Sequence, residues 1–338
     1  MRAWLLSETR GPEGYALGAV PDPEPGPGEV RIHLRTSALN HLDLWVAHGM
    51  PAPPAFPHVP GADGAGVVDA LGDGVADVAP GDEVMIDPST SCGSCDACRR
   101  GEVPFCREFR ILGEHRWGTH AEAIVVPAVN VVPKPASVSW DRAAAAGLVV
   151  SSAVRMIRRA RVEDGSDVLV VGVGGGSATA AMLVVRAGGA RVFATSTRDA
   201  SRAWAHANGA VAVFDSAGAF DEEVRVATDG GVDVVIDNVG SATFERSLRA
   251  LRRGGRFVTN GSTSGRTAEL HLPTLFWRQL EIVGSTMNDH REYADAVRLL
   301  AERHVEVPID ATFPFEDLPA ALERLEAGDQ LGKIVLNR

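Results

Sequence analysis

The sequence lacks the features that would mark a membrane or secreted protein. No apolar run among its 338 residues approaches the roughly 20 residues that a membrane-spanning helix needs. The first residues, MRAWLLSETRGP, have neither the basic start nor the long apolar centre of a secretory signal. Internal repeats and low-complexity segments are also missing. We therefore expect a cytoplasmic protein with no membrane partner, long enough to fold as two domains.

Positive charge is scarce as well. The chain has 33 Lys and Arg residues against 44 Asp and Glu, which gives a formal net charge of −11. Such a surface repels nucleic acid and anionic membranes, so we expect a small-molecule substrate, and any anionic ligand must be held by a local positive cluster. Lysine itself is rare, because only Lys134 and Lys333 are present. We interpret this scarcity as a compositional bias of the source, not as a functional signal.

Cysteine is absent except from one short segment, SCGSCDACRRGEVPFC. Its cysteines, at C-x2-C-x2-C-x7-C spacing, are Cys92, Cys95, Cys98 and Cys106. Four thiolates can close around a tetrahedral zinc ion and leave no open position, so the pattern predicts a structural zinc site. The neighbouring arginines that could offset its negative charge are Arg99, Arg100, Arg107 and Arg110. The alternatives are an iron–sulfur cluster, a disulfide pair or unused thiols, and disulfides are uncommon in cytosolic chains.

Two sequence patterns divide the chain. Up to about residue 149, short β-type runs such as VRIHL and GAGVV alternate with Pro/Gly-rich turns, which is typical of a partly open β-barrel. From Asp164 onward, apolar strands such as DVLVV alternate with helices, which predicts a parallel sheet covered on both faces. After Met287 the strand KIVLN has no sheet partner of its own. We therefore predict an α/β chain with domains at 1–149 and 150–287, and a segment, 288–338, that returns to the first domain.

A glycine-rich turn follows the first apolar strand of the second domain, in VLVVGVGGGSATAAMLVV. A backbone without Cβ atoms can approach a pyrophosphate closely, and the free N–H groups at the start of the next helix favour its negative charge. The turn therefore indicates dinucleotide binding, with a plain tight turn as the alternative. Its candidate cofactor-binding residues are Gly172, Gly174, Gly175, Gly176 and Ser177.

The next strand ends in Thr195-Ser196-Thr197-Arg198, without a carboxylate. An acidic residue at this point would hold the ribose hydroxyl of NAD, whereas hydroxyl groups and a guanidinium suit the 2′-phosphate of NADP. We therefore expect NADP(H), bound through Ser196, Thr197 and Arg198. Arg202, one helical turn beyond Arg198, either shares this role or is a solvated helix residue.

Together these features resemble the medium-chain dehydrogenase/reductase superfamily, which contains zinc-binding alcohol dehydrogenases and quinone oxidoreductases. The matching stretches cover essentially the whole chain: PEPGPGEVRI, ALNHLDLW, PGADGAGVV, PGDEV, the cysteine segment, the glycine-rich turn and LGKIVLN. The resemblance implies a GroES-like β-barrel substrate domain, a doubly wound Rossmann cofactor domain and hydride transfer with a nicotinamide. It also implies a homodimer or homotetramer formed through the sheet edge near EIVGST.

The chain departs from the alcohol dehydrogenases where their catalytic zinc would be bound. By resemblance, the three ligand positions hold Asn40, Ala62 and Leu148, and an amide, a methyl and an isobutyl group cannot bind zinc. Leu42 stands where those enzymes have a hydroxyl group that relays the alcohol proton. We therefore expect that the structural zinc is kept and that the catalytic zinc is lost.

Asn40 resembles the zinc-free quinone oxidoreductase branch, and GLVVSSAVRM and GSTMNDHREYADAVRLL are similar to NADPH-dependent reductases of enoyl-CoA thioesters. We therefore expect reduction of an activated double bond in a quinone, an enone or an enoyl thioester. The catalytic candidates are Asn40, as a hydrogen-bond donor to the enolate oxygen, and Asp63. Helix capping is the alternative for Asn40, and a supporting or capping role is the alternative for Asp63. By resemblance, His41 would lie near the cofactor pyrophosphate.

Two other functions stay open. An alcohol or aldehyde dehydrogenase could use a nonstandard metal site, for which the candidate ligands are His58, Asp63, Glu114 and His115. A second metal ion per chain would identify it. The chain could also be a catalytically inactive NADPH-binding regulator, which would bind the cofactor without oxidising it.

Overall fold

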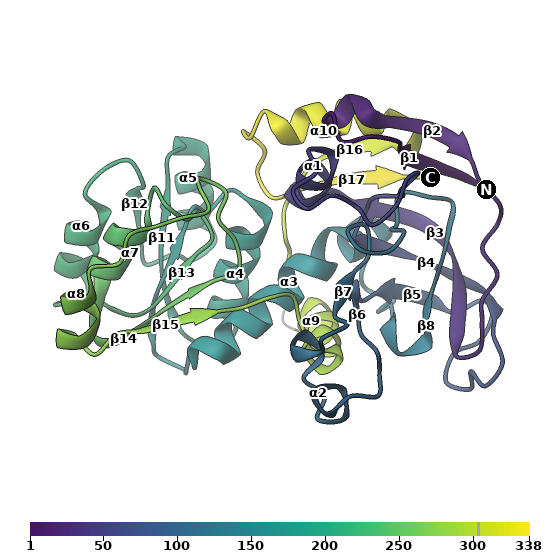
Figure 1. Cartoon of the computed structure of the whole chain (residues 1–338). Helices are drawn as coiled ribbons and strands as arrows, with labels where there is room; N and C mark the ends of the chain where they lie inside the picture. Colours follow the sequence, from purple (N-terminus) through teal and green to yellow (C-terminus); the bar gives the residue numbers. More distant parts are fainter. Residues whose placement is uncertain (303–304) are drawn as a thin grey trace. The chain divides into compact units, whose positions relative to one another are not determined.

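The computed structural model describes residues 1–302 and 305–338, which form two compact units (Figure 1). The first unit contains Met1–Ser151 and Asn288–Arg338, and the second contains Ser152–Met287. The division falls within helix α3 (Trp140–Ala160). None of the described helices combines the length and the apolar character that crossing a membrane requires.

The first unit is built on a sheet of seven described strands. Their order is β16-β17-β3-β4-β5-β9, and β8 pairs with β3 outside this path. The bounds are β3 (Glu29–Ala38), β4 (Asp63–Leu71), β5 (Glu83–Ile86), β8 (Ala123–Pro127), β9 (Val131–Pro133), β16 (Ile309–Pro314) and β17 (Lys333–Asn337). Alternate residues Val30, Ile32 and Leu34 of β3 are buried, as the period of a strand requires. Because β17 pairs antiparallel with β3, the end of the chain joins the N-terminal unit.

Shorter elements complete this unit. They are β1 (Arg2–Leu6), β2 (Tyr15–Ala19), α1 (His41–Ala47), β6 (Ser89–Thr90), α2 (Asp96–Arg99), β7 (Arg110–Ile111), α9 (His290–Glu302) and α10 (Leu318–Glu326), with 3-10 turns at Pro12–Gly14, Val103–Phe105, Ala128–Asn130 and Phe315–Asp317. Leu44 of α1, Leu322 of α10 and Leu336 of β17 belong to one apolar core. This core ties the segment after residue 287 to the start of the chain, and it fixes β17 beside α1.

The second unit contains a parallel sheet in the order β12-β11-β10-β13-β14-β15. Its strands are β10 (Asp167–Val171), β11 (Arg191–Ser196), β12 (Ala212–Asp215), β13 (Val232–Asp237), β14 (Leu251–Thr259) and β15 (Glu281–Gly284). Its helices are α4 (Gly176–Ala187), α5 (Asp199–Ala207), α6 (Phe220–Ala227), α7 (Phe244–Ala250) and α8 (Leu272–Trp277). Numbered along the chain, this order is 3-2-1-4-5-6, the arrangement of a doubly wound dinucleotide-binding fold. The predicted α/β architecture is confirmed.

Candidate functional site

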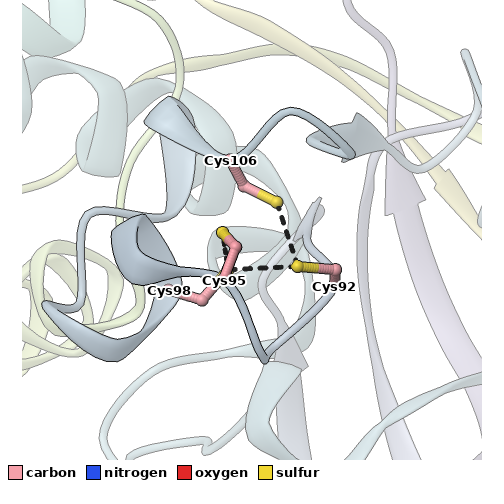
Figure 2. Close-up of side chains that lie close together, drawn as sticks. All are labelled: Cys92, Cys95, Cys98 and Cys106. Atoms are coloured by element: carbon pink, nitrogen blue, oxygen red, sulfur yellow. Dashed lines mark hydrogen bonds between the residues drawn. The ribbon is translucent and has the colours of Figure 1, made fainter.

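The four cysteine sulfurs converge in a lobe around α2, as Figure 2 shows. All four lie within 4.8 Å of one another, and the Cys95–Cys98 and Cys92–Cys106 sulfur pairs are both 3.5 Å apart. A disulfide needs about 2.05 Å between its sulfurs, whereas four sulfurs about 2.3 Å from one zinc ion lie about 3.8 Å apart. The donor set therefore suits a closed, four-coordinate zinc site. No other group of three or more potential metal ligands occurs among the described residues.

Backbone groups of the lobe favour the thiolate form that a metal requires. The N–H groups of Ser94 and then Cys95 donate to the sulfur of Cys92 and lower the pKa of this thiol to about 6. Of the four nearby arginines, Arg99 pairs with Asp96 and Arg100 pairs with Glu102. A role of arginine charge at the site stays a prediction.

A second polar cluster lies at the start of α1 in the first unit. Asn40 precedes this helix, and its backbone N–H donates to Asp43 Oδ2 at 2.8 Å. Asp43 is buried, and its other carboxylate oxygen accepts the N–H of Gly61 at 3.0 Å. Asp43 thus caps the helix and ties it to the loop before β4. The Asn40 side chain forms the other half of this capping box with the backbone N–H of Asp43.

That side chain belongs to a network with Asp63 and Lys333. Lys333 Nζ donates to Asn40 Oδ1 at 2.6 Å and to Asp63 Oδ2 at 2.9 Å, and Asn40 Nδ2 donates to the same Asp63 oxygen at 2.9 Å. Because an ammonium group can only donate, it identifies Oδ1 as the acceptor end of the amide. One N–H of Asn40 donates to Asp63, and among the described residues the second N–H has no acceptor, so it can donate to a ligand.

The other carboxylate oxygen of Asp63 contacts helix α3. Asp63 Oδ1 accepts the backbone N–H of Leu148 at 2.7 Å. The preceding residue must be glycine for this approach, since a Cβ atom on Gly147 would lie 2.8 Å from Asp63 Oδ1 and 2.9 Å from the hydroxyl oxygen of Tyr293. The carboxylate of Asp63 is therefore satisfied on both sides, by a buried cation and by a helix backbone.

In the second unit the glycine-rich turn runs from the end of β10 to α4. Gly172 and Gly174 have positive φ values of 82° and 124°, and a side chain on Gly174 would collide with Arg198 and Ser201. A Cβ on Gly175 would meet nothing nearer than 4.0 Å, and no side chain caps α4. Open space beside an uncapped helix start suits a dinucleotide pyrophosphate.

The end of β11 lies beside this turn. Ser196 Oγ accepts the N–H of Arg198 at 3.4 Å, and the guanidinium of Arg198 lies close to Gly174. Arg202 has a different environment: it donates to the Ser196 carbonyl and forms ion pairs with Asp199 and Asp215. Of the two arginines, Arg198 is the one placed at the turn, while the charge of Arg202 is matched by acids. Thr197 is exposed beside them.

Comparison with known proteins agrees with this layout. The family described as "Alcohol dehydrogenase GroES-like domain" matches residues 26–136, and the family described as "Zinc-binding dehydrogenase" matches residues 172–302. The acryloyl-coenzyme A reductase of Metallosphaera sedula is 31% identical over 327 residues, which are 96% of each chain. The chain belongs to the medium-chain dehydrogenase/reductase superfamily. The predicted oxidoreductase class is thereby confirmed.

Two solved structures show the range of activities among its relatives. A structure described as an NAD-dependent alcohol dehydrogenase is 40% identical, with a TM-score of 0.96 and full coverage of both chains. The 2-octenoyl-CoA carboxylase reductase CinF, solved with NADP and 2-octenoyl-CoA, is 28% identical with a TM-score of 0.92, and covers 99% of this chain and 87% of that one. Both support the GroES-like and Rossmann architecture of this dehydrogenase/reductase.

The alternative metal ligands are not brought together among the residues that the structure describes. His58 is buried, and its Nε2 lies 3.0 Å from the carbonyl oxygen of Gly113. His115 accepts a backbone N–H at Nδ1, Glu114 lies next to it, and Asp63 is paired with Lys333. The four side chains therefore form no cluster of metal ligands, and the expectation that they could converge is wrong.

His41 is the first residue of α1 and contacts the ring of Trp45. Burial lowers its pKa, and the positive charge of Lys333 lowers it further. This places a neutral imidazole beside the Asn40 cluster, while a role near the cofactor stays a prediction. Lys333 contacts both predicted catalytic side chains, Asn40 and Asp63. The sequence did not identify it as a site residue, because it stands in LGKIVLN, which only matched the family pattern.

Proposed function

We propose that this dehydrogenase/reductase is an NADP(H)-dependent reductase of activated double bonds, with enoyl thioesters ahead of enones and quinones, and that it acts without a catalytic metal. The observation that carries the proposal is the network of Lys333, Asp63 and Asn40. By resemblance, Asn40 and Leu148 stand at two of the zinc-ligand positions. Asn40 accepts a hydrogen bond from Lys333, and the backbone N–H of Leu148 donates to Asp63. The site thus holds a buried ion pair, and its described residues offer no ligand set for a divalent ion.

The chemistry that these residues can supply is stabilisation of an oxyanion. A bound reduced nicotinamide supplies a hydride, and the β-carbon of a conjugated acceptor receives it. Negative charge then develops on the carbonyl oxygen of the acceptor. The remaining N–H of Asn40 is a preorganised donor for that oxygen, because Lys333 and Asp63 hold both ends of the amide. The charges of Lys333 and Asp63 offset each other, so this pair serves to orient the amide.

The relatives include alcohol dehydrogenases and reductases of CoA thioesters, and the site residues of this chain favour a reductase. Alcohol oxidation near neutral pH depends on a Lewis acid that stabilises the alkoxide, and by resemblance this chain has Asn40, Ala62 and Leu148 where the zinc ligands would be. Conjugated acceptors need less help, since their charge spreads to a remote oxygen. The acryloyl-coenzyme A reductase of Metallosphaera sedula and the ligands named for CinF make an enoyl thioester the first substrate to test.

The remaining features complete the proposal. One zinc ion at the cysteine lobe has a structural role, and NADPH is preferred through Ser196, Thr197 and Arg198. We further propose a cytoplasmic homodimer or homotetramer formed through β15. Exposed apolar residues on and beside this strand support that surface: Leu272, Phe276, Trp277 and Ile282.

The test is a panel of crotonyl-CoA, enones, quinones, aldehydes and alcohols, each assayed with NADPH or NADP before and after treatment with a chelator. We expect chelator-resistant reduction of at least one activated double bond, and little or no oxidation of ethanol. Alcohol oxidation that disappears with the chelator and returns with zinc would overturn the proposal in favour of a metal-dependent dehydrogenase. NADPH binding without oxidation by any substrate would favour the inactive regulator.

A further inference from the structure

A buried aspartate and a partly exposed histidine form a pair in the first unit. Asp87 is 1% exposed, and its Oδ2 lies 2.8 Å from Nδ1 of His290, the first residue of α9. The side chain of His290 is 24% exposed, and its Nε2 makes no hydrogen bond or ion pair with the described residues. A carboxylate bound at one ring nitrogen fixes the tautomer and orientation of an imidazole and leaves the other nitrogen free to exchange a proton.

Asp87 is itself held rigidly. Its Oδ1 accepts the backbone N–H of Ser89 at 3.0 Å and Nδ2 of Asn288 at 2.9 Å. Asn288 is fully buried, and its Oδ1 lies 2.8 Å from the hydroxyl oxygen of Ser151, whose proton it shares with the carbonyl oxygen of Gly147. Among the described residues, Asp87 forms an ion pair with His290 alone. Such a chain of satisfied groups serves to orient the imidazole and would not be needed for a solvated surface histidine.

The same network lies next to the Asn40 cluster, because helix α3 contributes to both. Leu148 N donates to Asp63, and Ser151 Oγ donates to Asn288. These positions are three residues apart, so they share a helix face and are separated by about 4.5 Å along the axis. Tyr293 forms a second link: its hydroxyl donates to the carbonyl of Ile86, the residue before Asp87, and lies close to Gly147 beside Asp63.

From this juxtaposition we infer that His290 is the proton donor of the reduction and that Asp87 is its positioning residue. The inference rests on the proposed function. The hydride forms a C–H bond at the β-carbon of the acceptor, the carbon–carbon π bond breaks, and its electron pair moves onto the thioester as an enolate. The enolate α-carbon then takes the proton from Nε2 of the imidazolium. The nicotinamide is oxidised, the acceptor is reduced by two electrons, and the neutral imidazole regains its proton from water.

The inference predicts a specific pH dependence. Asp87 is the charged group in contact with the ring, and the charged neighbours of His290 along the chain are Asp289, just before α9, and Arg291 and Glu292 on α9. Asp289 and Glu292 bond to each other at the helix start. A donor must carry its proton, so kcat should fall toward alkaline pH. Removing the imidazole should remove this fall, which a purely structural role of His290 would not do.

The experiment compares wild type with His290→Gln and Asp87→Asn, using crotonyl-CoA and NADPH in H2O and D2O. His290→Gln should lower kcat about 100-fold or more, flatten the alkaline fall of kcat, and leave KM and the Kd of NADPH within threefold. In D2O, wild type should place deuterium on one face of the α-carbon and the variant on both. Asp87→Asn should lower kcat less than His290→Gln does. If this substitution of a buried residue prevents folding, the result for His290→Gln, at a partly exposed residue, decides alone.

The matched control is His33→Gln, on an exposed position of β3, which should match wild type throughout. If His290→Gln keeps kcat within threefold, with an unchanged pH profile and a single deuterated face, the inference is overturned while the proposed function stands. If wild type reduces neither crotonyl-CoA nor any other activated double bond, both are overturned. The two failures are therefore distinguishable from the wild-type assay alone.

Discussion

The ammonium nitrogen of Lys333 lies 2.9 Å from the Oδ2 atom of Asp63, and these side chains are 3% and 0% exposed. A buried pair of this kind stabilises little compared with an apolar pair of the same size, because both ions are removed from water. Removing one partner is costly, since the other charge stays buried. The pair is therefore better explained by what it holds in place, the amide of Asn40, than by its contribution to stability.

Lys333→Met should lower the free energy of unfolding by about 3–5 kcal/mol, because it leaves the carboxylate of Asp63 buried without its cation. The double variant Lys333→Met/Asp63→Leu should recover part of this loss. Lys134→Met is the matched control: Lys134 pairs with Glu83, which is 52% exposed, so water can replace the lost partner. Urea denaturation at pH 7 measures all of them. Equal losses for the two lysine variants would contradict the buried-pair argument.

Zinc should be found at one ion per chain, bound by the four cysteines of the lobe. Cys95→Ser should remove the ion and lower stability by several kcal/mol, since the metal bonds form only in the folded state. In whatever stays folded, NADPH oxidation should persist. Ser94→Ala is the control: it removes only a long hydrogen bond, at 3.7 Å, from an exposed hydroxyl to the sulfur of Cys92, keeps all four ligands, and should keep the metal. Metal analysis and thermal unfolding decide, and loss of activity without unfolding would argue against a structural role.

The sequence was sufficient for the architecture and for the residues whose chemistry is local. Cysteine spacing defined the lobe because its ligands are close along the chain, and alternating apolar strands and helices predicted the parallel sheet. The contacts of Asn40 could not be predicted from the sequence, because they join residues that are far apart in the chain. Lys333 lies 293 residues from Asn40 and 270 from Asp63, and β17 pairs with β3 only in the folded chain. No local sequence pattern shows that a lysine is buried, so the sequence alone does not distinguish Lys333 from a surface lysine.

NADPH should be preferred over NADH by at least tenfold in kcat/KM, which corresponds to about 1.4 kcal/mol. Ser196→Asp combined with Arg198→Ala should erase or reverse the preference, because a carboxylate repels the 2′-phosphate and binds the ribose hydroxyls. Arg202→Ala is the control: this arginine is already paired with Asp199 and Asp215, so its loss should affect the two cofactors alike. Steady-state kinetics with both cofactors test this, and equal use of both by wild type would refute it.

Stability should fall as the pH drops below about 6.5, partly because of His58. Burial lowers the pKa of its imidazole from 6.5, so the unfolded chain binds a proton that the folded chain does not. The stabilisation is complete above the unfolded pKa and is lost as pH falls through the folded pKa. His58→Asn should flatten the change in unfolding free energy between pH 7.5 and 5.5, whereas the exposed His33→Asn should not. Urea denaturation at several pH values would show the same slope in all three proteins if the reasoning were wrong.

Asn40→Ala should lower kcat/KM for an enoyl thioester by about 100- to 1,000-fold, the usual effect of losing one donor to a developing oxyanion. The Kd of NADPH should not change, because the substitution leaves the glycine-rich turn of the second unit intact. Asn40→Asp should be at least as slow: it keeps the size of the side chain, replaces the N–H donor with an acceptor, and sets a second negative charge against Asp63.

Asn208→Ala, which removes an amide from the end of α5, is the control. Asn40→Ala also removes one half of the capping box of α1, in which the Asn40 side chain accepts the backbone N–H of Asp43. Loss of the cap alone would lower the free energy of unfolding by about 1 kcal/mol and leave kcat/KM of the folded enzyme unchanged. Activity within threefold of wild type for Asn40→Ala would therefore remove Asn40 from the reaction and leave it only in the network with Lys333.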